Sequence, residues 1–373
     1  MQTFFAREIR ETLSIATEYR ELPQQAAALL DKQSPSNLPL MGAIPFDDTA
    51  TVQLFVPDRL HRAGPLAKVD PAATFANFNK KNYTLQAIPE PAIYMQGVDR
   101  ALERIDRAQL LKIVLSRSLE LSFSTPTDPS ELLANLARAN RHGYNYLINL
   151  SPKNKKNSHW LVGASPELLV RRRGMQVETN PLAGSAPLSG HALTDRTRAV
   201  ALMNSDKDRR EHALVVEAIA DTLSPLCREL DVPAAPSILE TDTMMHLSTR
   251  IQGTLRDRET CALSLSLALH PTPAVCGTPR QSAYAAIHDI DPFARRYFAG
   301  MVGWVDRRGD GEWAVTIRCG EARGRRLRLY AGAGVVAGST AETELAETSA
   351  KFRTMLKAIG VEHIEEQQRT PFC

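Results

Sequence analysis

The chain has 373 residues, of which 43% are hydrophobic and 23% charged, values typical of globular proteins with a sizeable buried core. A formal net charge of +3, with the basic residues scattered, gives no support to binding of nucleic acid or of an anionic membrane. The five cysteines show no CxxC spacing, which argues against a disulfide framework or a zinc ribbon and fits a reducing compartment.

The beginning of the chain carries acidic and basic side chains where a signal peptide would need an apolar run. No stretch approaches 18 uninterrupted apolar residues, so we expect no membrane-spanning segment. Together with the cysteine pattern, these features predict a cytoplasmic protein.

The first hundred residues are rich in proline and are the least regular third of the chain. Strand-like pieces such as residues 50–56 lie between turns and are expected to pack as a sheet. A helical pattern over residues 98–105 leads into an extended run at 112–123. Apolar residues share one face of that run and Lys112 lies on the other, polar face, which is the pattern of a half-buried strand.

The remainder mixes strands and long helices. We expect strands at residues 160–170, 303–317 and 325–336, and helices at 205–230, 261–269, 291–298 and 341–359. Strands often follow strands through turns such as residues 306–311, and the basic run 171–173 before Gly174 predicts a solvated hairpin turn. This order favours an α+β fold of largely antiparallel sheets flanked by helices over a doubly wound parallel fold. We expect one domain over residues 1–373, less regular to about 97.

Two expected helices carry carboxylates in unusual places. Asp208 and Glu211 fall on the apolar face of the helix from 205, although acids in a first turn can also simply complement the helix dipole. Glu344, Glu347 and Lys351 lie along the border of the apolar stripe of the final helix, where a surface ion-pair ladder is the alternative. Taken together, two pairs of acids at three-residue spacing suit Mg²⁺, whereas the histidines show no metal-binding spacing.

The glycine-rich stretch Tyr330-Ala-Gly-Ala-Gly-Val-Val-Ala-Gly338 contains a formal GxGxxA after a strand, as dinucleotide-binding proteins do. No helix opens at these glycines, and too little chain follows for a βαβ half-domain, so a nicotinamide cofactor is not expected. Glycines inside a strand instead allow backbone N–H groups to approach an anion closely.

Three further charged residues stand near apolar strands: Lys112, Glu167 and Arg318. Lys112 can be a solvated lysine, but a guanidinium closing an apolar strand needs an anionic partner or an exit to water. Reasoning from the residues alone ends at an enzyme with α and β elements, Mg²⁺ and a carboxylated small molecule.

Several motifs in order resemble the chorismate-utilising enzymes, the family of isochorismate, salicylate, anthranilate and aminodeoxychorismate synthases. The resemblance covers residues 98–358 and is weaker upstream. Its motifs are Leu111-Lys-Ile-Val-Leu-Ser-Arg117, Gly163-Ala-Ser-Pro-Glu167, Pro181-Leu-Ala-Gly-Ser185, Lys207-Asp-Arg-Arg-Glu-His212, His270-Pro-Thr-Pro-Ala-Val275, Thr316-Ile-Arg318, Ala331-Gly-Ala-Gly334 and Glu344-Leu-Ala-Glu-Thr-Ser-Ala-Lys351. The resemblance implies the fold of anthranilate synthase component I.

Details within these motifs are similar to the isochorismate-forming branch. Lys112 resembles its water-activating base, where amine-adding relatives carry glutamine, and the stretch before Cys276 lacks the Pro-Ala-Gly or Pro-Gly-Gly of anthranilate-type members. Salicylate synthases share the lysine but carry tyrosine where this chain has Phe298, so they are the main alternative. The resemblance further favours the catecholate (2,3-dihydroxybenzoate, enterobactin-type) siderophore pathway, with menaquinone biosynthesis as the other alternative. It implies a monomer without a glutaminase subunit.

The resemblance also implies roles for individual residues. Lys112 is the general base that activates the water attacking C2 of chorismate, and Glu167 is the general acid at the C4 hydroxyl, so the pKa of Glu167 must be raised. Mg²⁺ is held by Glu211 and Glu347, with Glu344 and Asp208 acting through waters. The substrate-binding residues implied are Gly184, Ser185, His246, Ala274, Val275, Phe298, Arg318, Gly332 and Lys351. Of these, Gly184 and Ser185 face the ring carboxylate, and Arg318, the Gly332 backbone and Lys351 hold the pyruvyl carboxylate.

Overall fold

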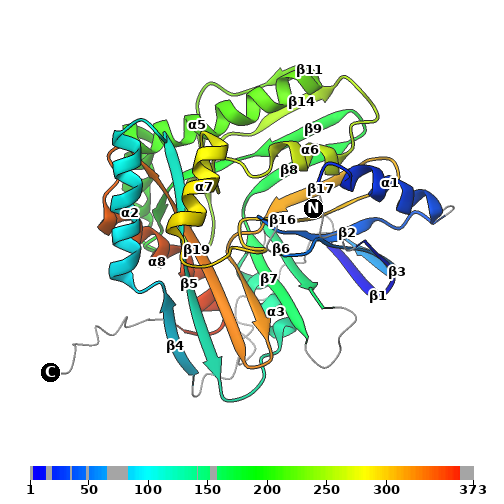
Figure 1. Cartoon of the computed structure of the whole chain (residues 1–373), viewed down its shortest axis with the longest axis horizontal. Helices are drawn as coiled ribbons and strands as arrows, with labels where there is room; N and C mark the ends of the chain where they lie inside the picture. The colour runs from blue at the N-terminus through cyan, green and yellow to red at the C-terminus, as the bar shows by residue number, and fades with distance from the viewer. Residues whose placement is uncertain are drawn as a thin grey trace.

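Two large sheets and one small sheet organise the chain. Strands of the two large sheets are labelled in Figure 1. The computed structural model describes residues 3–13, 19–33, 36–47, 50–64, 83–140, 142–151 and 158–361. Every pairing between its strands is antiparallel, as the order of strands and turns predicted.

The largest sheet has nine strands drawn from most of the chain. In spatial order they are β1 (Thr3–Leu13), β3 (Gln53–Ala63), β2 (Leu40–Ile44), β16 (Met301–Val305), β17 (Gly311–Val315), β8 (Leu168–Arg173), β9 (Gln176–Asn180), β14 (Ile251–Leu255) and β11 (Cys227–Asp231). The proline-rich N-terminal third therefore adds three strands to this sheet, beside strands that lie more than two hundred residues later.

The second sheet has seven strands. Six follow the order β15 (Gly277–Thr278), β5 (Lys112–Phe123), β19 (Arg326–Val336), β18 (Cys319–Arg323), β7 (His159–Ser165) and β6 (Tyr144–Asn149), and β4 (Tyr83–Ile88) also pairs with β5. A small third sheet has the order β10 (Leu182–Pro187), β13 (Met244–Ser248) and β12 (Ser237–Glu240).

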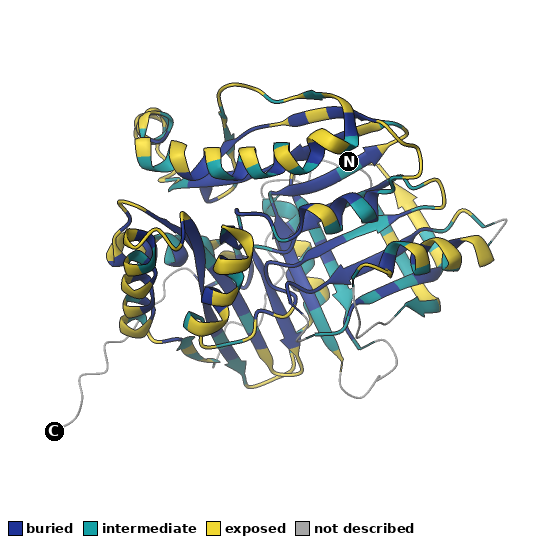
Figure 2. Ribbon diagram, turned by 45° about the horizontal axis from the view of Figure 1, so that its top comes forward, coloured by how far each residue is buried: buried dark blue, intermediate teal, exposed yellow. Residues whose placement is uncertain are grey.

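Helices flank these sheets, and their outward faces are exposed while the strands between them are buried (Figure 2). Their bounds are α1 (Leu22–Lys32), α2 (Pro91–Asp106), α3 (Pro129–Ala139), α4 (Ala192–Asn204), α5 (Asp206–Leu223), α6 (Ala262–Leu269), α7 (Arg280–Ile290) and α8 (Ala341–Ala358). Helix α8 packs on β19 and on α2, whereas α5 packs on β10. Helix α5 also contacts β19, so both helices that carry the paired acids lie against the glycine-rich strand.

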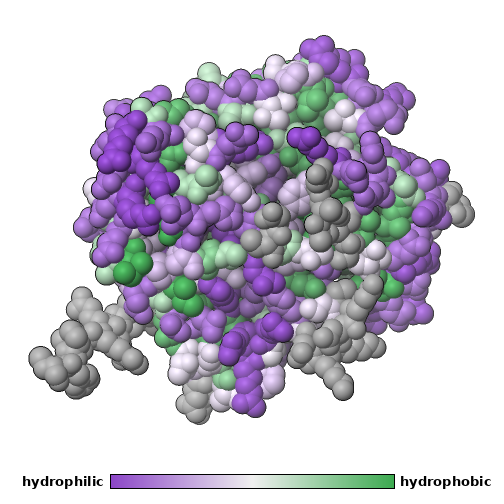
Figure 3. Space-filling view, viewed as in Figure 1, coloured by the Kyte–Doolittle hydropathy of each residue, from purple (hydrophilic) through white to green (hydrophobic). Residues whose placement is uncertain are grey.

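One hydrophobic core joins the two large sheets. It contains Leu54 and Trp313 from the nine-stranded sheet together with Ile113 and Leu115 from β5. Such a shared core orders the sheets relative to each other, because burying apolar surface on both at once is the main favourable term in folding. None of the helices in the described ranges combines the length and apolar character needed to cross a bilayer. The face in Figure 3 is mostly hydrophilic, with small scattered hydrophobic patches.

Several expected elements are confirmed almost to the residue. The run 112–123 is β5, the stretch 261–269 is α6, the final helix is α8, and 325–336 is β19. The turn at 306–311 joins β16 to β17, and Gly174 lies in the β8–β9 hairpin.

Other boundaries are wrong for identifiable reasons. The helix expected at 205–230 ends at Leu223, because Pro225 follows in a short 3₁₀ turn (Ser224–Leu226) and β11 begins at Cys227. The helix expected at 291–298 is a series of turns, whereas the preceding α7 was not foreseen. The strands expected at 160–170 and 303–317 are each two strands.

The expected exposure of two charged segments is also wrong. Arg172, in the basic run before Gly174, is buried and donates to the carbonyl oxygens of Arg308 and Arg258, so that run is not simply a solvated turn. Strand β5 is not half-buried either, because Lys112 and Ser116 on its polar face are as fully buried as its apolar face. That polar face is turned toward the interior between the sheets, where the candidate site lies.

Candidate active site

Two crossings between the large sheets form one side of a pocket. The chain passes from β7 to β8 through Pro166 and Glu167, and from β17 to β18 through Thr316, Ile317 and Arg318. The pocket at this junction has an empty volume of about 670 Å³, and both crossings line it. The strand expected at 160–170 therefore concealed a crossing between sheets, whereas the one expected at 303–317 merged two neighbouring strands of one sheet and ended within the second crossing. Each crossing carries a predicted functional residue.

Most of the predicted residues meet in this one pocket. Its walls include twelve of them: Glu167, Gly184, Ser185, Glu211, His246, Ala274, Val275, Phe298, Arg318, Gly332, Glu347 and Lys351. Lys112, Asp208 and Glu344 do not line it directly. Pro166, Leu182, Ala183, Ile317 and Tyr330 also line it, and sequence reasoning had not singled them out.

The paired acids come from two helix starts. Ser205 caps α5 by accepting a hydrogen bond from the Asp208 backbone N–H at 3.2 Å, and α8 begins with a capping box formed by Thr340 and Thr343. Glu211 and Glu344 are buried within these helices. The prediction that α5 and α8 turn their acids inward is confirmed for these two glutamates. Asp208 is only partly buried.

Each glutamate of this acid cluster has a lysine partner. Nζ of Lys112 lies 2.8 Å from Oε1 of Glu211, Nζ of Lys207 lies 2.8 Å from Oε1 of Glu344, and Nζ of Lys351 lies 2.6 Å from Oε1 of Glu347. Each of these three carboxyl groups beside the pocket is therefore matched by one ammonium group.

These charges set the protonation of the acids. Burial raises the pKa of Glu344 to about 7, and repulsion from Glu347 adds to the effect. Burial would also raise the pKa of Glu347, but Lys351 and Lys207 outweigh it and hold that pKa below its usual range. The two acids therefore differ in how readily they give up a proton.

The carboxylates of Glu211, Glu344 and Glu347 form a donor set that fits a hard divalent cation, although their side chains do not converge on one point. Carboxylate oxygens are the ligands Mg²⁺ prefers, and Oε2 of Glu344 is buried without a hydrogen-bond partner among the described residues. In the same described ranges, no three acidic, histidine or cysteine side chains lie close enough together to hold a metal ion. The lysine pairs account for this, because each carboxylate is already directed at an ammonium.

Gly334 makes space for one of these pairs. A Cβ placed on Gly334 would lie 2.2 Å from Oε1 of Glu211 and 3.0 Å from Cε of Lys112. The glycine in β19 therefore leaves room for an ion pair between side chains, which the sequence reasoning did not foresee. At Gly332, the backbone carbonyl oxygen accepts a hydrogen bond from Nζ of Lys351 at 2.8 Å.

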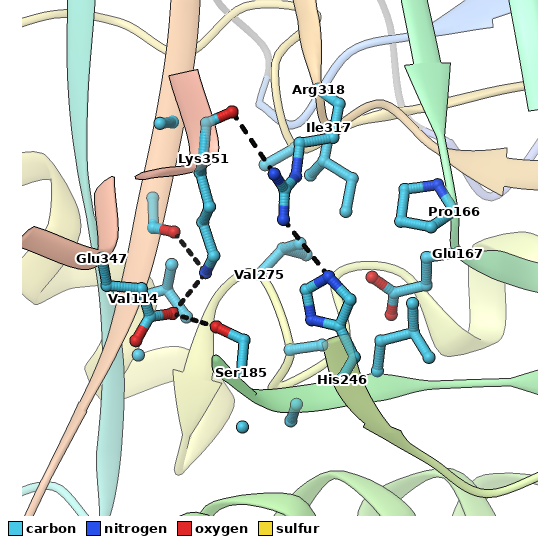
Figure 4. Close-up of a pocket in the computed structure, with 18 of the residues that line it drawn as sticks. Val114, Pro166, Glu167, Ser185, His246, Val275, Ile317, Arg318, Glu347 and Lys351 are labelled. Atoms are coloured by element: carbon cyan, nitrogen blue, oxygen red, sulfur yellow. Dashed lines mark hydrogen bonds and ion pairs between the residues drawn. The ribbon is translucent and has the colours of Figure 1, made fainter. Parts of the chain in front are cut away.

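Glu167 lies across the pocket from Glu347, with Arg318 and His246 between them (Figure 4). Its side chain is buried, and burial raises the pKa of Glu167 to about 7, against the opposing effects of a backbone hydrogen bond from Leu182 and the charge of Lys112. The expectation of a raised pKa at Glu167 is confirmed. Near neutrality this carboxyl group can donate a proton, as a general acid must.

Arg318 is held in an unusual conformation. Its φ of +49° lies in the left-handed region that residues other than glycine seldom adopt, and such strain concentrates at functional sites. The guanidinium lies 3.2 Å from Nε2 of His246 and donates to the carbonyl oxygen of Lys351 at 3.3 Å. Burial lowers the pKa of Arg318 to about 10. Burial also lowers the pKa of His246 well below its ordinary value, and the positive charge of Arg318 adds to this effect. A buried cation beside a neutral imidazole can receive a carboxylate.

Opposite Arg318, the small sheet supplies Gly184 and Ser185. Gly184 has a φ of +75°, and its missing side chain lets Asp208 approach, since a Cβ there would lie 3.0 Å from Cβ of Asp208. Ser185 donates to Oε1 of Glu347 at 3.0 Å. His212, which sequence reasoning did not single out, bridges the Ala183 carbonyl at 3.2 Å and the Thr249 hydroxyl at 2.7 Å. Its position next to Glu211 in the motif was the available signal.

The remaining wall is apolar. Phe298 stacks on Tyr330 with ring centroids 5.2 Å apart, and the Tyr330 hydroxyl donates to Glu321 at 3.4 Å. Val275 and Ile317 complete this side, as Figure 4 shows. The pocket thus has an apolar wall, an acidic corner (Glu211 and Glu347), a basic corner (Arg318 and Lys351) and a proton donor, Glu167. Such a pocket can bind and polarise a small dicarboxylate.

Comparisons with known proteins agree with this arrangement. A family model described as chorismate binding enzyme matches residues 39–360. Isochorismate synthase DhbC of Bacillus subtilis (strain 168) is 52% identical over 340 residues, which is 89% of this chain and 84% of that protein.

Two solved structures show the same fold. A protein of Bacillus anthracis described as a 2,3-dihydroxybenzoate-specific isochorismate synthase, DhbC, has a TM-score of 0.91 and 48% identity, with 96% of this chain and 94% of that chain covered. MenF, the menaquinone-specific isochorismate synthase of Escherichia coli, has a TM-score of 0.80 and 25% identity over 96% of this chain and 86% of that chain. The expected fold class is confirmed.

Proposed function

This chain belongs to the family of chorismate binding enzymes, and from that premise we propose that it is an isochorismate synthase. The observation that carries the proposal is the pocket at the junction of the sheets. There, a carboxyl group with a pKa of about 7 faces an acidic corner that contains a buried lysine. The similarity to DhbC of Bacillus subtilis supports the same activity.

Chorismate carries two carboxylates, which the two charged corners would receive. Arg318, Lys351 and the Gly332 backbone hold the pyruvyl carboxylate, because a guanidinium can donate two parallel hydrogen bonds to it. Gly184 and Ser185 face the ring carboxylate. His246, Ala274, Val275 and Phe298 line the space between and restrict the ring to one orientation.

Lys112 acts at C2 of the ring as the base, and Glu167 acts at C4 as the acid. Lys112 takes a proton from the water whose oxygen bonds to C2, and the two ring double bonds shift as the C4–O bond breaks. Glu167 gives its proton to the departing oxygen, which leaves as water. The net change is isomerisation, and acid–base assistance of this kind typically contributes about 10² to 10⁴ in rate.

We propose Mg²⁺ as the cofactor, held by Glu211 and Glu347 directly and by Glu344 and Asp208 through waters. When bound, the cation supplies positive charge that neutralises the ring carboxylate and these acids. The donor chemistry and the unpartnered oxygen of Glu344 support this ligand set.

The proposed product is the precursor of 2,3-dihydroxybenzoate siderophores. Support comes from the 48% identity to the 2,3-dihydroxybenzoate-specific protein, against 25% for the menaquinone-specific one. The chain acts as a monomer without a glutaminase subunit in this proposal. A cytoplasmic location is supported by the free thiols of Cys227, Cys261, Cys276 and Cys319, whereas Cys373 lies outside the described residues.

Chromatography of the products made from chorismate tests the function directly. Purified protein with chorismate and Mg²⁺ should accumulate isochorismate without pyruvate, and chelation of the metal should stop the reaction. The Lys112→Ala variant should lose about 10² to 10⁴ in turnover while still binding chorismate. Release of pyruvate would identify a salicylate synthase, and a product that requires ammonia would identify an amine-adding synthase.

A further inference from the structure

Lys207 occupies a central position in the acid cluster. Its Nζ donates a hydrogen bond to Oε1 of Glu344 at 2.8 Å, and its charge also interacts with Glu347 and Glu211. One ammonium therefore acts electrostatically on all three glutamates that the proposed function assigns to magnesium.

The acid that Lys207 contacts has unused binding capacity. The Glu344 side chain is fully buried, and only its Oε1 is engaged by Lys207. Its other oxygen, Oε2, is buried without a partner among the described residues, a costly arrangement unless another group sometimes satisfies it. Glu344 therefore keeps one carboxylate oxygen that Lys207 does not engage.

Lys207 is also the lysine best able to leave. Lys112 is completely buried in β5, and Lys351 is tied both to Glu347 and to the Gly332 carbonyl oxygen. The side chain of Lys207 is 25% exposed and extends from the first turn of α5. A cation there is disfavoured by the helix dipole, so its acidic partners are what hold it in place.

We propose that Lys207 is an internal counter-cation that holds the acid cluster in the metal-free protein and leaves Glu344 when the divalent cation binds. This inference rests on the magnesium site of the proposed function. Its geometric basis is the ion pair of Lys207 with Glu344, a carboxylate that the proposed site directs at the metal through water.

Calorimetric titration of Mg²⁺ into the substrate-free protein measures the competition. The Lys207→Met variant should bind Mg²⁺ roughly tenfold more tightly than the wild type, because a competing unit charge a few ångströms away is removed. Lys207→Arg keeps the charge and should bind no more tightly than the wild type. Lys357→Met removes a lysine of α8 that pairs with Asp242 on the surface, and its affinity should be unchanged. Equal or weaker binding by Lys207→Met would overturn the inference.

Amine labelling followed by mass spectrometry reports the movement itself. Addition of Mg²⁺ alone should increase reductive methylation of Lys207 several-fold and leave Lys357 unaffected. A protein that needs Mg²⁺ for isochorismate formation but shows no change at Lys207 would refute this inference and leave the proposed function intact. A wild-type protein that binds no Mg²⁺ would remove both the metal site and the inference.

Discussion

The buried carboxyl group of Glu167 is the residue on which pH acts most directly. As a general acid it must carry a proton, and its pKa of about 7 places the loss of that proton in the neutral range. We therefore expect kcat/KM for isochorismate formation to fall as pH rises above about 7. The pH–rate profile measures this fall.

The Glu167→Gln variant separates catalysis from folding. It should lose about 10² to 10⁴ in rate below about pH 7, where Glu167 of the wild type carries its proton, and less at higher pH. Because the folded state raises the pKa of Glu167, the wild type gives up stability as pH rises from about 4 to 7, and the penalty is complete above 7. The variant should therefore be at least as stable as the wild type at pH 8 in a thermal melt. An active variant would remove Glu167 from the reaction.

At the scale of elements, the ion pair between Lys112 of β5 and Glu211 of α5 fits against strand β19 because residue 334 has no side chain. In the Gly334→Ala variant, the added methyl group would displace Glu211 from Lys112, since the strand itself is fixed by its pairing with β5. Misplacing catalytic groups by about 1 Å can cost on the order of 10²-fold in rate, and we expect a loss of this size.

Steady-state kinetics, together with circular dichroism to confirm the fold, test this expectation. Gly64→Ala is a suitable control, because a methyl group there meets no atom within 4 Å. Wild-type turnover in Gly334→Ala would show that the Lys112–Glu211 pair tolerates displacement.

The elements that periodicity predicted well are those whose context matches their pattern. Helix α8 and strand β5 have apolar residues that recur at helical and at alternating spacing over most of their length, so their bounds were predicted closely. The helix expected over 291–298 does not form. Asp291 and Arg295 have the four-residue spacing of a helical ion pair, but both side chains also bond to distant parts of the chain. Arg295 donates to the Val114 and Val275 carbonyl oxygens, and Asp291 accepts from the Ser116 backbone.

The candidate site shows the same division. The residues lining the pocket were predicted largely through motifs, whereas the crossings that bring Glu167 and Arg318 together could not be. An apolar run does not indicate that the chain changes sheets at Pro166 or at Thr316, because the change of sheet depends on which distant strands pair. The pairs Lys112–Glu211 and Lys207–Glu344 were missed for the same reason, whereas the pair of Glu347 with Lys351 matches the ion-pair alternative considered for the final helix.

At the scale of the whole molecule, the shared core makes a prediction about folding. Because buried residues of both large sheets belong to one cluster, we propose that the chain unfolds as a single domain. Differential scanning calorimetry should show one transition with equal calorimetric and van't Hoff enthalpies. Two separable transitions would instead divide the chain into independently folding parts.

The one-to-one pairing of glutamates with lysines also bears on how the protein meets its surroundings. Asp208 and Arg318 add one further acidic and one further basic group, so the groups around the pocket carry little surplus charge. Long-range forces therefore draw in neither a lone dianion nor a lone divalent ion strongly. Chorismate and Mg²⁺ cancel each other when they arrive together. Salt screens long-range attraction between net charges. Ionic strength should therefore have little effect on the rate at which the neutral pair of Mg²⁺ and chorismate binds.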